Sequence, residues 1–329
     1  MTISTVTYDI NQFRVAIKAE TTVGTPNVAT MQLVNIDSNV NITRNPYQHN
    51  GYRAGVGRTK KKPDHFVQEY GQVKSFQLTG IADKASFPML MENCVGVTEA
   101  SQTIDIAYNY TGADFAVGLA AVSDNIHTLT VALVSPIAAN SVVIAGCIVD
   151  EITYTDDIED GGRRHFTATL MTKNNILDGQ ATPTSMTAYP TTYYSWFDLT
   201  AQKAIGGSDV VLGKVDLRVK SNVRFMGLGT NGVGELIDRG IPGIEVTAAV
   251  SVKFDANTKD LLTDYEDATD IIVNIADNAA IASAAMGFVG NFAHLTTDVN
   301  NTETEDGAFI DLEFEFFAST TGNVIQIAV

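Results

Sequence analysis

A cluster of positive charge is the clearest chemical feature of the sequence. Six of the 21 Lys and Arg residues fall within residues 43–71, and no acidic residue occurs between Arg44 and Pro63. The six basic residues are Arg44, Arg53, Arg58, Lys60, Lys61 and Lys62. A segment of this kind can be a solvated loop that self-repulsion holds open, an arm that docks on an acidic protein surface, or an arm that binds nucleic acid.

We favour the docking arm, seated on the acidic surface of a neighbouring identical subunit. The net charge of −17 would repel phosphate backbones from the rest of the chain, which disfavours the nucleic-acid arm. Tyr47 and Tyr52 could anchor the contact, because aromatic residues often supply most of an interface's binding energy. Glycines 51, 55 and 57 would let the segment fold on contact.

Negative charge follows a two-residue period near the end of the sequence. In residues 310–316, apolar side chains alternate with Asp311, Glu313 and Glu315. Because successive side chains of a strand point to opposite faces, the three carboxylates should share one face. That face can be an ordinary solvent face or a functional acidic lining. The matching strand of the first half carries the neutral Thr167 and Thr169.

A second acidic group comprises Asp150, Glu151, Asp156, Asp157, Glu159 and Asp160. The spacing lacks the Asp-x-Asp-x-Asp-Gly order of a calcium loop. We therefore interpret this group as a partner for the basic arm rather than as a metal site.

Signatures of enzyme chemistry are weak. Residues 227–232 fit G-x-G-x-x-G, but Pro242 and nearby glycines leave no room for the helix of a dinucleotide site. The five histidines are scattered without metal-ligand spacing, and no G-x-S-x-G elbow occurs. Cys94 and Cys147 are interpreted as buried apolar residues. We expect no enzyme activity, no cofactor and no metal.

The elements that position these residues occur in two similar series. Ser38-Asn39-Val40 lies in a heptapeptide, 36–42, whose character returns in 219–225 around Ser221-Asn222-Val223. Each copy is followed by a long loop (43–71 in the first), an alternating strand (73–78 or 246–254) and a short helix after Ser86 or after Asn257 or Thr258. Each series ends in a strand after an acidic turn, with Phe166, Ala168 and Leu170 matching Ile310, Leu312 and Phe314.

The repeat predicts a mainly β protein with two tandem domains of β-sandwich or barrel type, each with a short flanking α-helix. A chain of 329 residues is long enough for two cores. The domains expected are 1–180 and 196–329, joined by a Thr-, Pro- and Tyr-rich linker at 181–195. No run of 18 apolar residues and no leader is recognised, so we expect a soluble protein without a membrane partner.

Several of these pieces resemble the tail tube (major tail) proteins of long-tailed bacteriophages. The resemblance rests on residues 16–26 (AIKAETTVGTP), the basic loop that ends in a strand, residues 143–149 (VIAGCIV), and the run from Gly213 to Asp270. It extends over most of the chain, in the type and order of elements.

The resemblance implies a structural virion protein, assembled in the host cytoplasm, whose stacked rings form a channel for genome delivery. Rings in this family are six-fold, so a duplicated chain implies trimeric rings with pseudo-six-fold symmetry; a hexameric ring with one domain outside the barrel is the alternative. The implied partners are further copies of the chain, the tape measure protein, and tail terminator or tip proteins. Double-stranded DNA would pass through without specific binding, and Asp311, Glu313 and Glu315 would line the channel.

A β-sandwich carbohydrate-binding or adhesin module is the second hypothesis. Such a module typically carries a planar aromatic platform, and the candidates here are Trp196 and the Tyr193-Tyr194 pair. These residues lie in or beside the linker rather than on a predicted strand, which favours the tube protein.

Overall fold

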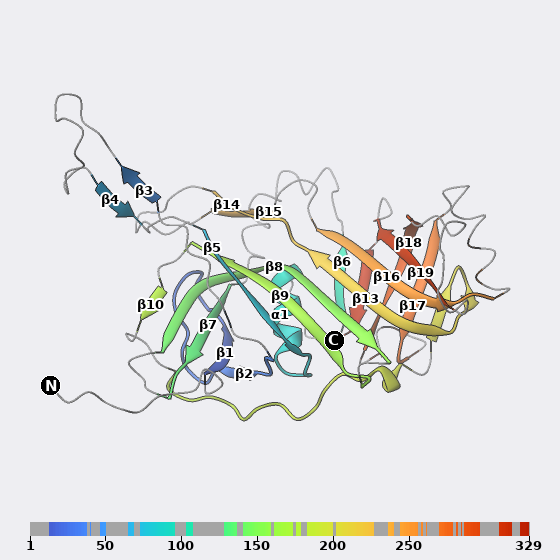
Figure 1. Ribbon diagram of the computed structural model, residues 1–329, viewed down its shortest axis with the longest axis horizontal. Coiled ribbons are helices and arrows are strands. Elements are labelled where there is room, and N and C mark those ends of the chain that lie inside the picture. Colours follow the sequence, from blue (N-terminus) through green and yellow to red (C-terminus); the bar gives the residue numbers. More distant parts are fainter. Residues whose placement is uncertain are drawn as a thin grey trace.

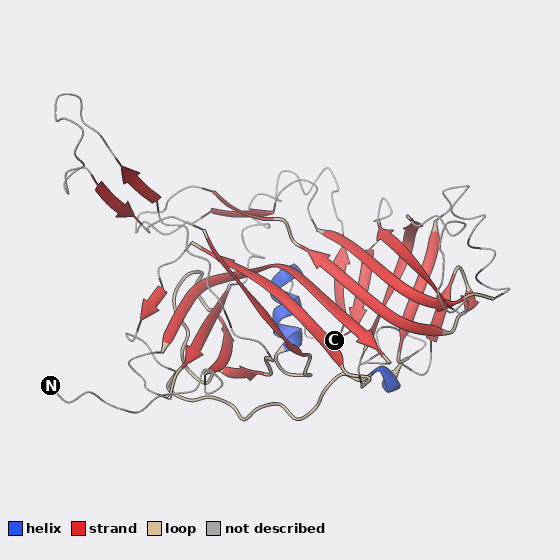
Figure 2. Ribbon diagram, viewed as in Figure 1, coloured by secondary structure: helices blue, strands red, loops and turns tan. Residues whose placement is uncertain are grey.

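The computed structural model shows a mainly β protein. It describes residues 13–37, 40, 47–50, 65–68, 73–95, 103–107, 128–136, 141–158, 161–173, 176–178, 183–199, 202–226, 236–239, 244–255, 258, 261, 270–278, 281, 284, 286–296, 309–317 and 323–328. Figure 1 shows the strands in chain order, and Figure 2 shows how few described residues are helical.

The elements of the first half are β1 (Arg14–Ala19), β2 (Gln32–Val34), β3 (Tyr47–Asn50), β4 (His65–Gln68), β5 (Lys74–Ile81), α1 (Phe87–Val95), β6 (Thr103–Ala107), β7 (Leu129–Val134), β8 (Val142–Asp157), β9 (Arg164–Thr172) and β10 (Ile176–Asp178). Those of the second half are the 3₁₀ helix η4 (Trp196–Asp198), β11 (Gln202–Ile205), β12 (Ser208–Asp209), β13 (Leu212–Lys220), β14 (Val223–Met226), β15 (Leu236–Arg239), β16 (Glu245–Lys253), β17 (Ile271–Ala276), β18 (Gly287–Leu295), β19 (Phe309–Phe316) and β20 (Asn323–Ala328).

Most strands belong to one open antiparallel sheet. Its path runs β12-β11-β17-β18-β19-β16-β13-β8-β7-β1-β2, and β5, β6, β9, β10 and β20 pair with strands of this path or with one another. Two hairpins, β3–β4 and β14–β15, form separate two-stranded sheets. The first hairpin lies within the predicted loop 43–71, so that segment is not wholly a loop.

The strand pairing of the first half is repeated in the second. The series β5-β9-β8-β7-β1-β2 has the same neighbours as β16-β19-β18-β17-β11-β12. Likewise, β10 pairs with β8 as β20 pairs with β18. Even an irregularity recurs: the ladder shifts between Leu129 and Val131 in β7, and between Ile271 and Val273 in β17.

The registers define which residues correspond. Leu170 pairs with Phe76 in the first half as Phe314 pairs with Ala248 in the second. These pairs agree with the predicted match of Phe166, Ala168 and Leu170 to Ile310, Leu312 and Phe314.

The heptapeptide match does not follow this register. Gly80 lies four residues after Phe76 in β5, and Val252 lies four residues after Ala248 in β16. Ile36 forms a β-bridge with Gly80, and Leu212 pairs with Val252. Ile36 therefore corresponds to Leu212, and the predicted match of Ile36 to Val219 was wrong by seven residues. Ladder hydrogen bonds fix the register, whereas a three-residue identity recurs easily by chance.

Two pairings join the halves. Along β8 and β13, a continuous ladder runs from Glu151 opposite Lys220 to Asp157 opposite Lys214. At a separate position, β6 of the first half pairs with β20 of the second. Buried side chains from both halves form one large apolar cluster. The halves thus share a sheet and a core in the described structure.

The helix predicted after Ser86 is α1. Asp83 supports its first turn, because its carboxylate accepts hydrogen bonds from the backbone N–H and the hydroxyl of Ser86. Phe87 is buried against Tyr154 and Phe166 of β8 and β9, which places α1 under the sheet in Figure 1. The second predicted helix lies largely outside the described residues.

The predicted linker has no regular structure before η4, but it is bound to the first half. Thr187 donates to the carbonyl of Met31, and Tyr194 and Arg164 are joined by a backbone hydrogen bond. Figure 1 shows this segment running along the lower edge of the first half. Cys94 and Cys147 are both buried, as predicted, and neither forms a disulfide.

Candidate assembly surface

The acidic side chains of β19 lie on its exposed face. Asp311, Glu313 and Glu315 are exposed and alternate with buried apolar residues, as the sequence predicts. Their direct neighbours on β16 are Ser251, Ala249 and Thr247. These neighbours carry no charge, and on the other side of β19 His294 of β18 is opposite Glu315. The three carboxylates form a negative stripe along β19.

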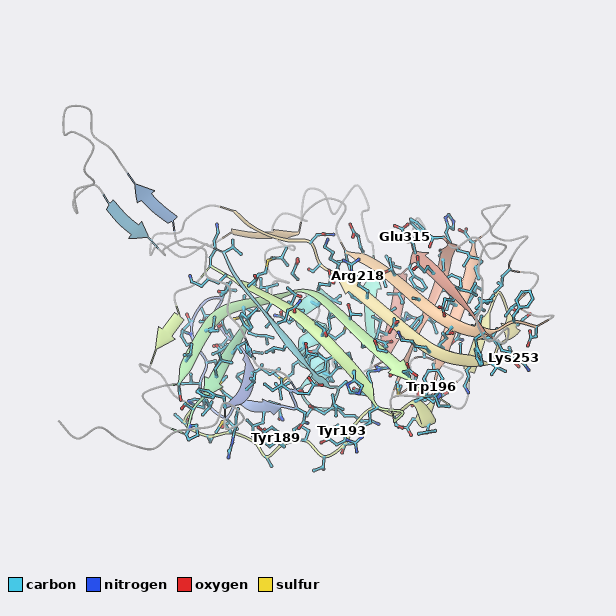
Figure 3. The ribbon with its side chains drawn as sticks, viewed as in Figure 1. Tyr189, Tyr193, Trp196, Arg218, Lys253 and Glu315 are labelled. Carbon is cyan, nitrogen blue, oxygen red and sulfur yellow. The ribbon has the colours of Figure 1, made fainter. Side chains whose placement is uncertain are left out.

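Next to this stripe, two basic residues of β13 are paired with carboxylates within the chain. Arg218 of β13 donates a hydrogen bond to Glu151 of β8 over 2.7 Å, and Lys214 lies 2.8 Å from Asp216. The hydrogen bond with Glu151 raises the pKa of Arg218, and that with Asp216 raises the pKa of Lys214. In Figure 3, Arg218 and Glu315 lie near the same edge, and the register places only Thr247 between them.

The corresponding face of β9 carries no carboxylate. Thr167 and Thr169 of β9 are partly exposed, as the alternation predicts. Their hydroxyls contact Thr79 and Gln77 of β5, each at 3.3 Å. One strand with three carboxylates and one with none therefore occupy corresponding places in the two halves.

The second acidic group is not a free surface for the basic arm. Asp156 is buried and forms a bidentate ion pair with Arg164, with 2.7 Å between Oδ2 and Nη2. Asp150 accepts a hydrogen bond from the backbone N–H of Val223, and Glu151 is paired with Arg218. For Asp156 the predicted role as partner of the arm was wrong, because its side chain is buried and bound to Arg164. For Asp150 and Glu151 that role stays a prediction. Glu159 and Asp160 lie outside the described residues.

The buried Arg164 is a feature that the sequence interpretation missed. Its guanidinium lies 3.9 Å from the ring centre of Tyr154 and 5.0 Å from that of Tyr194. The ion pair with Asp156 keeps the pKa of Arg164 raised despite burial, which acts to lower it. The sequence held a signal for this burial. Arg164 lies two residues before the buried Phe166, so on an alternating strand both side chains point to the same face.

The predicted docking arm is described only in part. Tyr47 begins β3, and the hairpin pairs Tyr47 with Gln68. Arg44, Tyr52, Arg53, Arg58, Lys60, Lys61 and Lys62 lie outside the described residues. Residues 227–232, the G-x-G-x-x-G match, also lie outside them, and strands β14 and β15 flank that segment.

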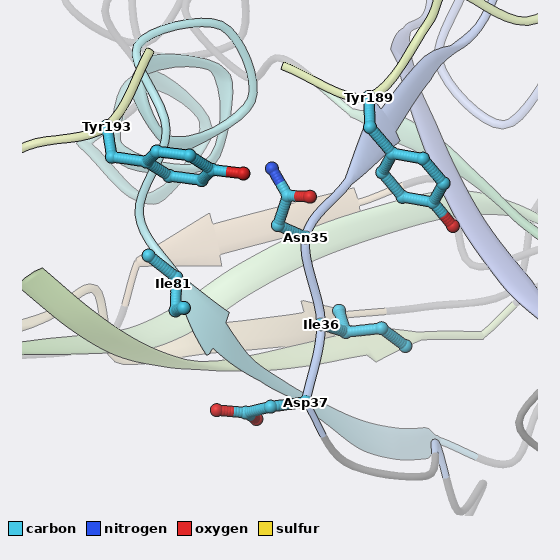
Figure 4. A pocket seen from close by; sticks show the side chains of 6 residues that line it. All are labelled: Asn35, Ile36, Asp37, Ile81, Tyr189 and Tyr193. Atoms are coloured by element: carbon cyan, nitrogen blue, oxygen red, sulfur yellow. The ribbon is translucent and has the colours of Figure 1, made fainter. Parts of the chain in front are cut away.

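An open pocket of about 340 Å³ lies between the first half and the linker. Its lining residues are Asn35, Ile36, Asp37, Ile81, Tyr189 and Tyr193. Figure 4 shows the two tyrosines on either side of Asn35. The amide of Asn35 is bound to Asp83 and to the carbonyl of Pro190, at 3.2 and 3.3 Å, which fixes the linker against β2.

The aromatic platform considered for a carbohydrate-binding module is not formed by its predicted residues. Tyr194 is 1% exposed and Trp196 is 7% exposed, so neither can stack on a sugar ring. Among those candidates only Tyr193 lines the pocket, and Arg163 already covers its ring at 5.1 Å.

Comparison with protein families and with curated proteins finds no match for this chain. In the part of the chain that the structure describes, no three His, Cys, Asp or Glu side chains are grouped to hold a metal ion. No helix among those residues is long and apolar enough to cross a membrane.

Proposed function

We propose that this chain is a structural virion protein, a bacteriophage tail tube subunit. Copies of it form rings, the rings stack into a tube, and the tube carries double-stranded DNA to the host without specific binding. It acts without catalysis or cofactor. Its partners are further copies of itself, the tape measure protein inside the tube, and terminator or tip proteins at the tube ends. Assembly takes place in the host cytoplasm.

The repeated strand pairing is the observation that carries this proposal. Two series of strands with the same neighbours, the same registers and the same ladder shift support two tandem domains that arose by duplication. They also support a subunit that contributes two equivalent units to one ring. A protein with a single binding site would not need this equivalence.

The junction between the halves suggests how a ring closes. Within the chain, β9 connects to β16 through two strands, β8 and β13. By the repeated pairing, β19 of the second half corresponds to β9, and β5 of the first half corresponds to β16. We propose that β19 of one copy connects in the same way, through two strands, to β5 of the next copy. Head-to-tail contacts of this kind form rings when the rotation closes, and closure removes exposed sheet edges.

A trimer is the ring that we favour. Three chains with two units each give pseudo-six-fold symmetry, which is the count implied by the resemblance to tail tube proteins. A hexamer would instead place one domain of each chain in the barrel and the other outside it. In the hexamer the two halves would no longer be equivalent. The repeated strand pairing of the halves therefore favours the trimer.

The charge on β19 suits a channel for DNA. Carboxylates that face phosphates repel them, so the duplex can slide past without adhering. Asp311, Glu313 and Glu315 supply this negative stripe, and the neutral Thr167 and Thr169 would alternate with it around the ring.

The basic arm is proposed to join neighbouring subunits. Replacing Lys60, Lys61 and Lys62 with Glu should block polymerisation, because the change reverses the charge that the contact is proposed to use, and it should leave the fold intact. The fold is checked by circular dichroism and polymerisation by sedimentation. Tubes that form normally from this variant would rule out the docking role.

Electron microscopy of the concentrated protein tests the proposal as a whole. We expect stacked rings or tubes with an axial hole. Discrete monomers under all conditions of salt and concentration would contradict it, and they would favour a binding module instead.

A further inference from the structure

The pocket between the first half and the linker has the chemistry of a site for a cation. Its lining includes two tyrosines and one carboxylate, and none of the lining residues is Lys or Arg. Tyr189 is 43% exposed, and the side chain of Asp37 is 48% exposed. A tyrosine ring attracts a cation to its face, and a carboxylate attracts it by charge. The volume of about 340 Å³ has room for one long side chain.

The wall that carries the carboxylate is held on two sides. The backbone N–H of Asp37 donates to the carbonyl of Thr79 in β5, and the amide of Asn35 is bound to the linker as described above. In Figure 4, Tyr193, Ile81 and the Asp37 carboxylate lie on the same side of this wall. The groups that would meet a ligand are therefore fixed before it arrives, which lowers the entropic cost of binding.

The Asp37 carboxylate has no strong partner within the described structure. Its oxygen Oδ2 lies 3.9 Å from Nδ1 of His165, which is beyond hydrogen-bonding distance. No Lys or Arg among the described residues forms an ion pair with it. The carboxylate can therefore accept hydrogen bonds from a ligand without giving up an existing one.

The core of the first half already binds a guanidinium with the same set of groups. Arg164 is paired with Asp156 at 2.7 Å. Its guanidinium lies 3.9 Å from the ring centre of Tyr154 and 5.0 Å from that of Tyr194. The pocket presents the same set, two tyrosine rings and an aspartate, but its lining supplies no arginine. The missing member of the set is a guanidinium from outside the pocket.

We propose that this pocket binds the guanidinium group of an arginine side chain on a partner polypeptide. The guanidinium donates to the Asp37 carboxylate, while its planar face and carbon stem lie against the tyrosine rings and Ile81. Arginine suits the site better than lysine, because a guanidinium is planar, stacks on aromatic rings and is less strongly hydrated than an ammonium. The net charge of −17 also favours the approach of a basic partner.

Arg163 is the basic residue beside the pocket that opposes this ligand. Its side chain is exposed, and its guanidinium lies 5.1 Å from the ring centre of Tyr193, so that ring already attracts one guanidinium. A second cation at the pocket is repelled by the first. Arg163→Gln should therefore strengthen binding of the partner's arginine by about threefold. Unchanged or weaker binding in Arg163→Gln would contradict a cationic ligand.

Titration of the full chain with blocked arginine, N-acetyl-argininamide, tests the proposal. Binding is measured by NMR on the ligand signals and should be saturable. Asp37→Asn should weaken it about tenfold, because the charged acceptor is lost. Tyr189→Leu should weaken it about threefold, and Tyr189→Phe, which keeps an aromatic face, should restore it. Asp198→Asn is the matched control, because it removes the same charge from an exposed residue that does not line the pocket.

Two further ligands identify what the pocket recognises. Blocked lysine, which has the same charge without the planar group, should bind several-fold more weakly than blocked arginine. Free arginine should bind no better than the blocked form if the partner is a polypeptide, and a clear preference for free arginine would assign the pocket to a small molecule instead.

Several results would overturn the proposal. These are no saturable binding of blocked arginine, equal binding of blocked lysine, or an equal loss in Asp198→Asn and Asp37→Asn. Circular dichroism and thermal unfolding of each variant should match the unchanged protein, because the substituted side chains are exposed. The tube proposal is tested by assembly and stands or falls separately from these results.

Discussion

The first two strands of each half are connected in different ways. In the second half, Gly206 and Gly207 join β11 to β12 in a tight turn, and both have positive φ angles of 60° and 80°. In the first half, residues 20–31 join β1 to β2. There the carboxylate of Glu20 accepts hydrogen bonds from the N–H groups of Gly24 and Gly146, at 2.7 and 2.8 Å. The same pairing is thus held by backbone conformation in one half and by a carboxylate in the other.

The cores of the halves also differ in which strand supplies a bulky side chain at one place. Ile144 of β8 corresponds to Gly290 of β18, because Val131 and Val273 are their respective partners. Two residues beyond the matched Leu170 and Phe314, Thr172 corresponds to Phe316. The Phe316 ring lies over Gly290, so the bulk supplied by β8 in the first half is supplied by β19 in the second. At this place in the core, the two halves fill a corresponding space with side chains from different strands.

One of the two largest effects should come from the ion pair seen in the first half. Asp156→Ala leaves Arg164 buried without its counter-ion, so unfolding in urea should show a loss of about 3–5 kcal/mol. Trp196, the only tryptophan, lies in the adjoining segment, so its fluorescence reports loss of this region.

A double variant separates the lost charge pair from the lost packing. Asp156→Leu combined with Arg164→Met should be less destabilised than Asp156→Ala, because no uncompensated charge remains. If Asp156→Ala costs less than about 1 kcal/mol, the pair does not hold the first half as described.

The exchange of bulk between the halves predicts a compensating pair. Phe316→Thr should destabilise by about 3–5 kcal/mol because it leaves a cavity. Adding Gly290→Ile, which copies the arrangement of the first half, should recover part of that loss, whereas Gly290→Ile alone should be destabilising by overpacking. Thermal and urea unfolding give the three values. Strictly additive losses would contradict the correspondence of Ile144 with Gly290.

The connections between the first strands should show an intermediate effect. Glu20→Ala removes the acceptor for Gly24, Gly146 and the hydroxyl of Thr130, and should cost about 2–3 kcal/mol. In the second half, Gly207→Ala meets no atom within 4 Å but keeps the positive φ, so it should cost about 1–2 kcal/mol. Urea unfolding compares them, and a larger loss for Gly207→Ala would reverse this ranking.

Alkaline pH should produce the smallest effect. Burial raises the pKa of Tyr154 above its usual value of about 10. The stability from keeping Tyr154 neutral is complete below pH 10 and is lost as pH rises above 10 toward the higher folded pKa, because the unfolded chain ionises first. Tyr154→Phe should be nearly neutral at pH 7, since the hydroxyl has no hydrogen-bond partner among the described residues.

At pH 11 this variant should be more stable than the unchanged protein by about 1.4 kcal/mol. Urea unfolding at both pH values measures the difference. An equal effect of the substitution at pH 7 and at pH 11 would show that Tyr154 is not shielded from ionisation.

Alternation made part of the fold predictable. The faces of β9, β16 and β19 follow the two-residue period, and Asp83 and Ser86 lie at the predicted start of α1. A strand with one buried face and a helix start both leave local patterns. The pairing of β8 with β13 leaves none, because it depends on contacts far apart in sequence.

The surface was less predictable for a similar reason. The carboxylates of β19 alternate visibly with apolar residues, whereas Asp156 looks like its partly exposed neighbour Asp157 until its register partner Arg164 is known. The exposed side chains of Val211, Phe254 and Phe309 were also missed as neighbours, because they come together only through the ladders of β13, β16 and β19. The heptapeptide match predicted repeated elements, but its register differs from that of the ladders by seven residues.

The rotational symmetry and mass of a single ring test the central claim most directly. If the two halves are equivalent units, end-on images should show six similar densities, and the ring mass should be three times the chain mass of 35.3 kDa. Alternate densities should differ where one half carries Asp311, Glu313 and Glu315 and the other carries threonines. Six densities in a ring of six chains would contradict the account, because each chain would then place only one of its halves in the barrel.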